Sequence, residues 1–288
     1  PPPPPPPPHF QAEDGIRDPD HSLVGSEMCI RDSIRIQYGT DSLQFGDLIL
    51  PYASNRSPVV MIIHGGCWRS SYDLTLMDSM AVDLAQRGYV TWNIEYRRTE
   101  DEGGGWPGTF NDVAQAFKHL SVLAEKYPFD INNVIITGHS AGGHLALMLG
   151  AQSKLKSSSE IKIDNLPRIK GIVSLAGITD LNTYHSDQGC GNNVRNLVDG
   201  LPDEMPGRYE EGSPIAHLPL GVPQILINGE DDGIVSIDHI DPYYKKAIEK
   251  GDPIDLVTIP NAGHFEVITP GSTAWPAIIN VFNVLREE

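Results

Sequence analysis

The sequence predicts an α/β protein with a mostly parallel, doubly wound sheet. Short, continuous apolar runs alternate with helical stretches along most of the chain, as expected of parallel strands that are buried on both faces. Helices between consecutive strands provide the crossover connections that a parallel sheet requires. Loops rich in glycine and polar residues follow several of these runs, and open sheets of this kind place their functional groups there.

The predicted strands are the apolar runs, and they lie at about residues 34–38, 46–50, 59–63, 89–94, 133–137, 170–176, 223–228 and 254–259. The predicted helices lie between or after the later runs, at Leu74–Arg87, Phe110–Tyr127, Ser140–Gln152, Ile237–Lys250 and Thr273–Arg286. No helix separates the first two runs, so we expect them to form an antiparallel edge. Residues 34–288 have the length of a single α/β domain, and no internal repeat divides them.

A Gly-His-Ser-Ala-Gly sequence at residues 138–142 lies directly between a predicted strand and a predicted helix. A serine at such a sharp turn is a nucleophile elbow, in which the flanking glycines let strand and helix approach closely and the serine Oγ projects above the sheet. A serine that merely capped the helix would need neither glycine. We therefore predict that Ser140 is a catalytic nucleophile.

A nucleophilic serine needs a base and an acid that orients the base. His264 lies in the loop after the run at 254–259, and adjacent Asp231 and Asp232 lie in the loop after the run at 223–228. Both loops lie beyond the C-terminal ends of strands, where the sheet would bring them together. His139 and His144 flank the serine but lie in no such late loop, and we expect them to pack around the site.

Residues 64–68 read His-Gly-Gly-Cys-Trp and follow the buried run at 59–63. A glycine pair in this place leaves backbone N–H groups uncovered by side chains, which suits an oxyanion hole. We predict that the N–H groups of Gly66, Cys67 and Ala141 hold the oxyanion.

Taken together, these stretches resemble the α/β-hydrolases of the esterase/lipase type. The resemblance is strongest to the subgroup with a His-Gly-Gly-x-Trp motif, which includes kynurenine formamidase-like enzymes and small carboxylesterases, and it covers nearly all of the chain after residue 33. Relatives of hormone-sensitive lipase usually carry a third glycine where this chain has Cys67, which weakens the analogy to them. The resemblance implies the α/β-hydrolase fold, with the chain order serine, aspartate, histidine.

The resemblance also assigns further roles. The spacing Gly-x-x-Asp-x-x-Val between residues 229 and 235 selects Asp232 over Asp231 as the triad acid. Residues 181–221, which contain prolines and glycines and little periodicity, are the expected cap over the substrate pocket. The family motif places His64, Gly65 and Trp68 at that pocket.

Residues 1–33 require a separate interpretation. Eight prolines open the chain, and residues 11–18 and 23–32 resemble translated sequencing-adapter sequences, in the order in which a sequencing library would carry them. A natural proline-rich leader would not explain both stretches. We expect residues 1–33 to be a non-native, disordered leader, which leaves the native N-terminus and any signal peptide outside this sequence.

Composition excludes several classes of partner. The net charge of −17 argues against nucleic acid, because no basic stripe could neutralise phosphates. No apolar run approaches the ~20 residues of a membrane span. Besides Cys29 in the leader, only Cys67 and Cys190 are present, without metal-ligand spacing. They could form one bridge, but we expect the reduced pair of a cytoplasmic enzyme.

The sequence thus predicts a serine hydrolase, independent of metals and cofactors, that cleaves carboxylic esters of small molecules through a Ser140-His264-Asp232 triad and an acyl-enzyme. Within the same chemistry, the alternatives are an arylformamidase that cleaves amides of the N-formylkynurenine type, and a peptidase. A more distant alternative is a non-catalytic binding protein with the hydrolase fold. The oligomeric state is not predicted.

Overall fold

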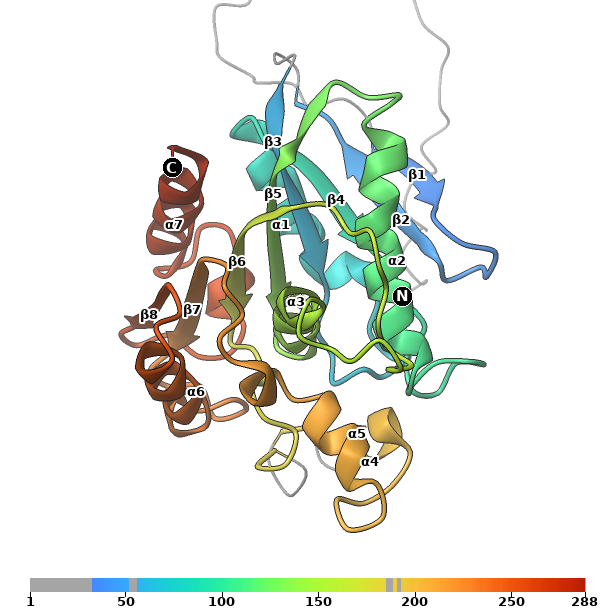
Figure 1. The fold of residues 1–288 in the computed structure, drawn as a ribbon. Coiled ribbons are helices and arrows are strands. Elements are labelled where there is room, and N and C mark those ends of the chain that lie inside the picture. Colours follow the sequence, from blue (N-terminus) through green and yellow to red (C-terminus); the bar gives the residue numbers. More distant parts are fainter. Residues whose placement is uncertain (1–32, 52–55, 185–188, 191–192, 288) are drawn as a thin grey trace, which may run out of the picture.

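The computed structural model describes residues 33–51, 56–184, 189–190 and 193–287. Within these residues the chain forms an eight-stranded sheet with the order β1-β2-β4-β3-β5-β6-β7-β8 (Figure 1). The strands are β1 (Ile34–Gln37), β2 (Phe45–Ile49), β3 (Ser57–Ile63), β4 (Val90–Ile94), β5 (Phe129–His139), β6 (Ile169–Leu175), β7 (Gln224–Gly229) and β8 (Ile254–Ile259). Strand β2 is antiparallel to both β1 and β4, and the other pairs are parallel. The predicted parallel sheet with an antiparallel edge is confirmed.

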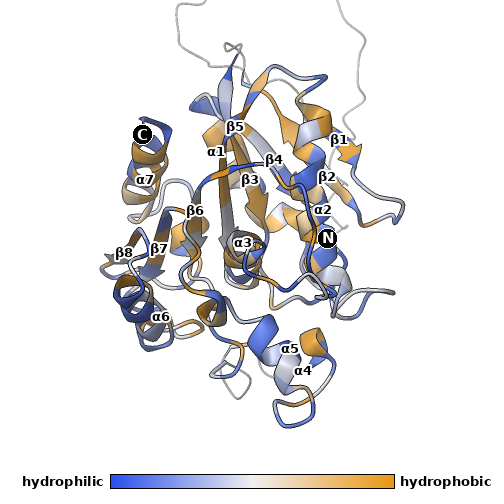
Figure 2. Ribbon diagram, viewed as in Figure 1, coloured by the Kyte–Doolittle hydropathy of each residue, from blue (hydrophilic) through white to orange (hydrophobic). Residues whose placement is uncertain are grey.

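Helices cover both faces of the sheet (Figure 1). The helical elements are η1 (Leu74–Met77), α1 (Asp78–Gln86), α2 (Gly108–Leu123), α3 (Ala141–Ala151), α4 (Asn193–Val198), α5 (Pro206–Glu211), η2 (Pro214–His217), α6 (Ile237–Glu249), η3 (Glu266–Ile268) and α7 (Trp275–Glu287). Successive residues of a strand face opposite sides of a sheet. Accordingly, Met61 and Ile63 of β3 pack with α2 and α3, whereas Val60 and Ile62 pack with α1 and α7. Figure 2 shows the hydrophobic colours concentrated on the central strands, between these two layers.

Some element boundaries differ from the prediction. The first predicted helix is divided into the 3₁₀ turn η1 and the α-helix α1, and the Asp73 carboxylate caps the turn by accepting the Thr75 N–H at 2.9 Å. Strand β5 begins at Phe129 rather than at residue 133, and its pairing with β3 shifts register between Pro58 and Val59. The segment between β6 and β7, which includes the predicted cap at residues 181–221, contains α4, α5 and η2.

The parallel register brings the loops of interest to one edge. Ile63 at the end of β3 pairs with Gly138 near the end of β5, and Gly229 at the end of β7 pairs with Ile259 at the end of β8. The residues that follow these four strands therefore meet. Helices α4 and α5 lie beyond the same edge, where the arrowheads of β3 and β5 point (Figure 1). The predicted leader at 1–33 falls, except for Ser33, outside the described residues.

Candidate active site

Ser140 occupies the turn between β5 and α3 in a conformation that side chains rarely adopt, with φ 55° and ψ −116°. Left-handed backbone costs an L-residue about 1–2 kcal/mol. Neighbouring bonds hold it there, since the Ser140 N–H donates to the Leu175 carbonyl at 2.8 Å and the Ser140 carbonyl accepts the His144 N–H. A Cβ added at Gly138 would lie 2.2 Å from the Gly142 carbonyl oxygen, so the elbow requires glycine there. The geometry is that of a nucleophile elbow.

The structure brings Asp232, and not Asp231, to His264. The Nδ1 of His264 lies 2.7 Å from Oδ2 of Asp232, and both side chains are buried. The second carboxylate oxygen, Oδ1, accepts the N–H groups of Ile234 and Val235 at 2.8 and 2.9 Å. Burial alone would raise the pKa of Asp232, but the bond from His264 and these N–H groups outweigh it and lower the pKa. Asp232 is therefore ionised and aligned, whereas Asp231 is exposed.

His139 connects the histidine loop to the elbow. Its Nε2–H donates to the His264 carbonyl at 2.8 Å, and the two rings lie 4.4 Å apart. Complete burial lowers the pKa of His139 to about 3, so the ring is neutral and adds no charge beside His264. The loop itself packs against the end of β7, because a Cβ at Gly229 would lie 2.1 Å from the Ala262 carbonyl.

The loop at 64–68 packs directly on the elbow. A Cβ added at Gly65 would lie 2.7 Å from the His139 carbonyl and 3.2 Å from the Ser140 Cβ. The next residues have left-handed backbone, with φ of 98° at Gly66, 55° at Cys67 and 54° at Trp68. The N–H groups of Gly66 and Cys67 donate to no acceptor in the part of the chain that the structure describes.

The N–H of Ala141 completes this set. Ala141 is the first residue of α3, so its N–H has no partner within the helix and lies at the positive end of the helix dipole. Free donors from a loop and from a helix N-terminus, beside a strained serine, are the parts of an oxyanion hole. The predicted donors Gly66, Cys67 and Ala141 donate their N–H groups to no acceptor among the described residues.

His64 controls the direction of the Gly66 N–H. Its Nδ1 lies 2.8 Å from the Gly65 carbonyl and its Nε2 lies 3.0 Å from Oε1 of Glu95. Both ring nitrogens therefore face an oxygen acceptor, and the contact with Glu95 is completely buried. In a planar trans peptide the C=O and N–H point in opposite directions. Binding the Gly65 carbonyl therefore turns the Gly66 N–H away from the His64 ring.

The structure does not support the prediction that His64, Gly65 and Trp68 lie at an open substrate pocket. The side chains of His64 and Trp68 are both fully buried, so neither lines an open pocket. His64 faces Glu95, as described above, and the Trp68 ring packs edge-on against His144 with 5.3 Å between ring centroids. Gly65 is also buried, against the elbow. The side chains of His64 and Trp68 therefore support the loop from the protein interior.

The prediction of a reduced cysteine pair is wrong. A disulfide joins Cys67 to Cys190, whose Cα atoms lie 5.2 Å apart. In addition, Asn193 at the start of α4 donates from Nδ2 to the Cys67 carbonyl at 2.8 Å. The segment between β6 and β7 therefore touches the predicted oxyanion loop through both a covalent bond and a hydrogen bond.

Sequence reasoning missed Glu95 and Asn193. Glu95 directly follows the apolar strand β4, and an acid in that place could have signalled a buried partner. Its other oxygen accepts the Leu74 N–H at 3.1 Å, and Arg98 contacts Oε1 at 3.1 Å. Asn193 lies in a segment with no periodic pattern, so no local signal marked it.

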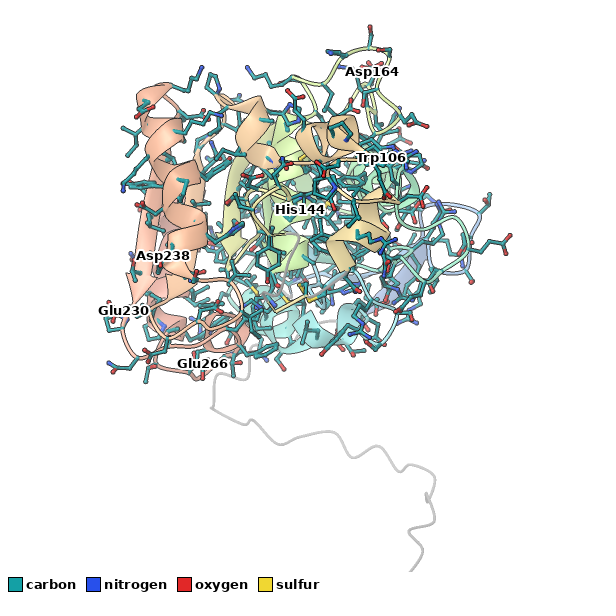
Figure 3. All side chains as sticks on the ribbon, turned by 90° about the horizontal axis from the view of Figure 1, so that it is seen from below. Trp106, His144, Asp164, Glu230, Asp238 and Glu266 are labelled. Carbon is teal, nitrogen blue, oxygen red and sulfur yellow. A yellow bond between two sulfur atoms is a disulfide. The ribbon has the colours of Figure 1, made fainter. Side chains whose placement is uncertain are left out.

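The end of the sheet that carries these residues has an acidic rim. Figure 3 looks onto this end and shows Glu230, Asp238 and Glu266 on the same side of it. Their side chains and that of Asp231 are exposed, and they flank the loops of Asp232 and His264. Anionic substrates would be repelled on this side of the site.

One hollow lies beside the triad loops and a larger one lies away from them. One of about 470 Å³ runs beside the histidine loop, between α1 and residues 265–270. Another of about 690 Å³ lies at the opposite edge of the sheet, where α3 ends and β6 begins, and it is remote from Ser140. Among the described residues, no group of three or more His, Cys, Asp or Glu side chains is placed to hold a metal ion, and no helix is long and apolar enough to cross a membrane.

A doubly wound sheet with a serine elbow, followed along the chain by an aspartate and a histidine that meet beside it, defines an α/β-hydrolase. The sequence model of the BD-FAE family matches residues 47–246, and the chain belongs to that family. Among curated proteins, the chain is 24% identical to Esterase LipC of Mycobacterium tuberculosis over 254 residues, which cover 84% of this chain and 62% of LipC. It is 26% identical to the kynurenine formamidase of Salmo salar over 255 residues, or 82% of this chain and 75% of that protein.

The chain thus spans less than two thirds of LipC.

Solved structures support the fold. A truncated carbohydrate esterase from gut microbiota aligns with a TM-score of 0.78 and 21% identity, over 91% of this chain and 99% of that one. Esterase B from Lactobacillus rhamnosis aligns with a TM-score of 0.75 and 19% identity, over 90% of this chain and 86% of that one. The predicted α/β-hydrolase fold is confirmed.

Proposed function

We propose that the protein is a serine esterase that hydrolyses carboxylic esters of small molecules. The observation that carries this proposal is the buried 2.7 Å bond between His264 and Asp232, on loops packed against the elbow that holds Ser140. A histidine fixed in this way has Nδ1–H donating to the carboxylate, which leaves Nε2 free to accept a proton. A non-catalytic binding protein would have no need of this alignment.

In the proposed mechanism, Nε2 of His264 removes the Ser140 proton while Oγ attacks the ester carbonyl. Ionised Asp232 stabilises the imidazolium that forms, and its low pKa keeps it ionised across the working range. The N–H groups of Gly66, Cys67 and Ala141 bind the oxyanion of the tetrahedral intermediate. Protonated His264 then donates its proton to the departing alcohol, which leaves an acyl-Ser140.

Deacylation uses the same groups in a second cycle. His264 removes a proton from water, the resulting nucleophile attacks the acyl carbonyl, and the oxyanion again forms opposite the N–H groups. Collapse of this intermediate releases the carboxylic acid, and His264 returns the proton to Ser140. Every step uses a side chain or backbone group of this chain, so neither a metal nor a cofactor is required.

The acidic rim favours neutral esters over anionic ones. Exposed Glu230 and Asp231 lie on the loop of Asp232, exposed Glu266 follows His264, and a carboxylate on the substrate would approach like charges there. A formamidase acting on N-formylkynurenine-type amides is the second candidate, and the similarity to the fish kynurenine formamidase favours it. The cytoplasmic location stays a prediction, and the disulfide weighs against it because such bonds persist mainly in oxidising compartments.

Two substrates and one pair of variants test this proposal. On p-nitrophenyl acetate, we expect a burst of p-nitrophenol close to one equivalent per protein when deacylation is slower than acylation, and Ser140→Ala should abolish turnover. Ser153→Ala is the matched control, because Ser153 is exposed at the far end of α3, and it should retain full activity. Activity of Ser140→Ala within tenfold of the parent protein would refute the mechanism. A kcat/KM for N-formylkynurenine well above that for short-chain esters would favour the formamidase.

A further inference from the structure

The predicted oxyanion loop is held by the segment between β6 and β7 at two different atoms of one residue. The Cys67 Sγ is bonded to Cys190, and the Cys67 carbonyl accepts the Nδ2–H of Asn193 at 2.8 Å. Cys190 and Asn193 are 4% and 7% exposed, so solvent competes little with these contacts. A role in packing alone would not require both groups to converge on the same backbone unit.

The two contacts determine the direction of a third group. The Cα of Cys67 is tetrahedral, and its substituents are the Cβ, the carbonyl carbon, the backbone nitrogen and a hydrogen. The disulfide holds the Cβ, and Asn193 holds the carbonyl. With those two directions set, the direction of the Cα–N bond is set as well, and φ about that bond then orients the N–H that is predicted to bind the oxyanion.

Cys67 needs this support because its backbone is left-handed at φ 55° and lies between two further left-handed residues. Residues that carry a Cβ avoid positive φ. An unrestrained loop would therefore relax toward negative φ, and the Cys67 N–H would turn away from the predicted oxyanion hole. Glycine tolerates the conformation without help, but cysteine does not.

We propose that Asn193 and the Cys67–Cys190 disulfide are positioning groups that hold the Cys67 N–H in the oxyanion hole. This inference rests on the proposed esterase function. Neither group touches the substrate, and both act through the backbone of Cys67. Their loss should therefore lower kcat and leave KM nearly unchanged, because the oxyanion exists only in the transition state and the intermediates.

Reduction of the disulfide is the first test. Dithiothreitol supplies two electrons and two protons, the bond between Cys67 and Cys190 becomes two thiols, and the reagent closes to its cyclic disulfide. Complete loss of one oxyanion donor lowers kcat by about 10²- to 10³-fold. A loosened donor is lost only part of the time, so we expect kcat for p-nitrophenyl acetate to fall by about 5- to 50-fold. Reoxidation should restore it, which an unfolded protein would not show.

Asn193→Leu is the second test, and it leaves the disulfide in place. Leucine has a similar volume but no donor, so kcat should again fall by about 5- to 50-fold with KM within twofold. Arg195→Ala is the control, because Arg195 is exposed on the same helix, and its kcat should not change. Reduction of the Asn193→Leu protein should add a further loss, with the total not exceeding the roughly 10³-fold cost of one donor.

The outcomes separate this inference from the proposed function. If Ser140→Ala retains turnover, the esterase mechanism fails, and the positioning role of Asn193 and the disulfide fails with it. If Ser140→Ala is inactive while both reduction and Asn193→Leu leave kcat within twofold, only the positioning role of Asn193 and the disulfide is refuted. A fall in kcat matched by an equal rise in KM would also overturn it, because that result would show a role in substrate binding instead.

Discussion

Replacing Asp232 by asparagine separates the charge of the proposed triad acid from its shape. In the native site Oδ2 faces Nδ1 of His264, while Oδ1 accepts the N–H groups of Ile234 and Val235. Asparagine offers one oxygen and one NH₂ group in those two places, so it must choose between two orientations. If its oxygen keeps the two backbone bonds, its NH₂ group faces Nδ1. His264 must then carry its proton on Nε2, where it can no longer accept one from Ser140.

The opposite orientation restores the active tautomer at a calculable cost. The asparagine oxygen would face His264, and the NH₂ group would face two buried N–H donors and leave both unpaired. Each unpaired buried donor costs about 1–3 kcal/mol, so the active orientation lies roughly 2–6 kcal/mol above the inactive one. Since about 1.4 kcal/mol corresponds to a factor of ten, the active fraction is roughly 4 × 10⁻² to 5 × 10⁻⁵. We expect kcat to fall by the same factor.

Steady-state hydrolysis of p-nitrophenyl acetate by Asp232→Asn and Asp231→Asn checks this reasoning. Asp231 is exposed, so its variant should lose less than about tenfold. A thermal melt of both proteins establishes that the fold is intact. Should Asp231→Asn be the crippled variant and Asp232→Asn the mild one, the assignment of the acid would be wrong. A loss below tenfold in Asp232→Asn would show that histidine tautomer does not limit the reaction.

Three further predictions concern the loop and the buried histidines. Gly66→Ala should inactivate the enzyme, since the new Cβ would lie 2.3 Å from the Tyr72 Cβ at a φ of 98°, and active-site titration would show it. His64→Ala should lower kcat by about 10²-fold with little change in KM, because the Gly66 N–H loses its orientation and Glu95 loses one of its buried partners. Burial lowers the pKa of His144 to about 4, so between pH 6.5 and 4 the unfolded chain binds the extra proton and stability falls as the pH falls. His144→Gln should therefore flatten the dependence of Tm on pH in that range. An unchanged slope would show that His144 does not cause this dependence.

The fold could be predicted because its signals are local. Each parallel strand is a short apolar run, and the glycines at 138 and 142 mark the elbow by themselves. The choice of Asp232 over its neighbour depended on the spacing to Val235, and the structure shows why that spacing matters, since the Val235 N–H binds the same carboxylate. Local pattern and site geometry agree there.

The remaining features depend on partners that are distant in sequence. Cys67 and Cys190 are 123 residues apart, and nothing in either neighbourhood indicates the bond between them. Helices α4 and α5 have six residues each, which is too short for a periodic pattern to be recognised. His64 was expected to face the substrate. Only the position of Glu95, at the end of another strand, determines that the ring turns into the core instead.

These distant partners also organise the loop at 65–68, the proposed oxyanion hole. Its successive carbonyls are each bound: Gly65 by His64, Gly66 by the Arg69 N–H, Cys67 by Asn193 and Trp68 by Thr99. The acceptors of the loop are thereby satisfied, whereas the N–H groups of Gly66 and Cys67 have no acceptor among the described residues. Because each peptide is planar, the bound carbonyls of Gly65 and Gly66 orient the N–H groups of Gly66 and Cys67 before any substrate arrives. An oxyanion then meets donors that need no reorganisation, which is the condition under which such donors contribute most to catalysis.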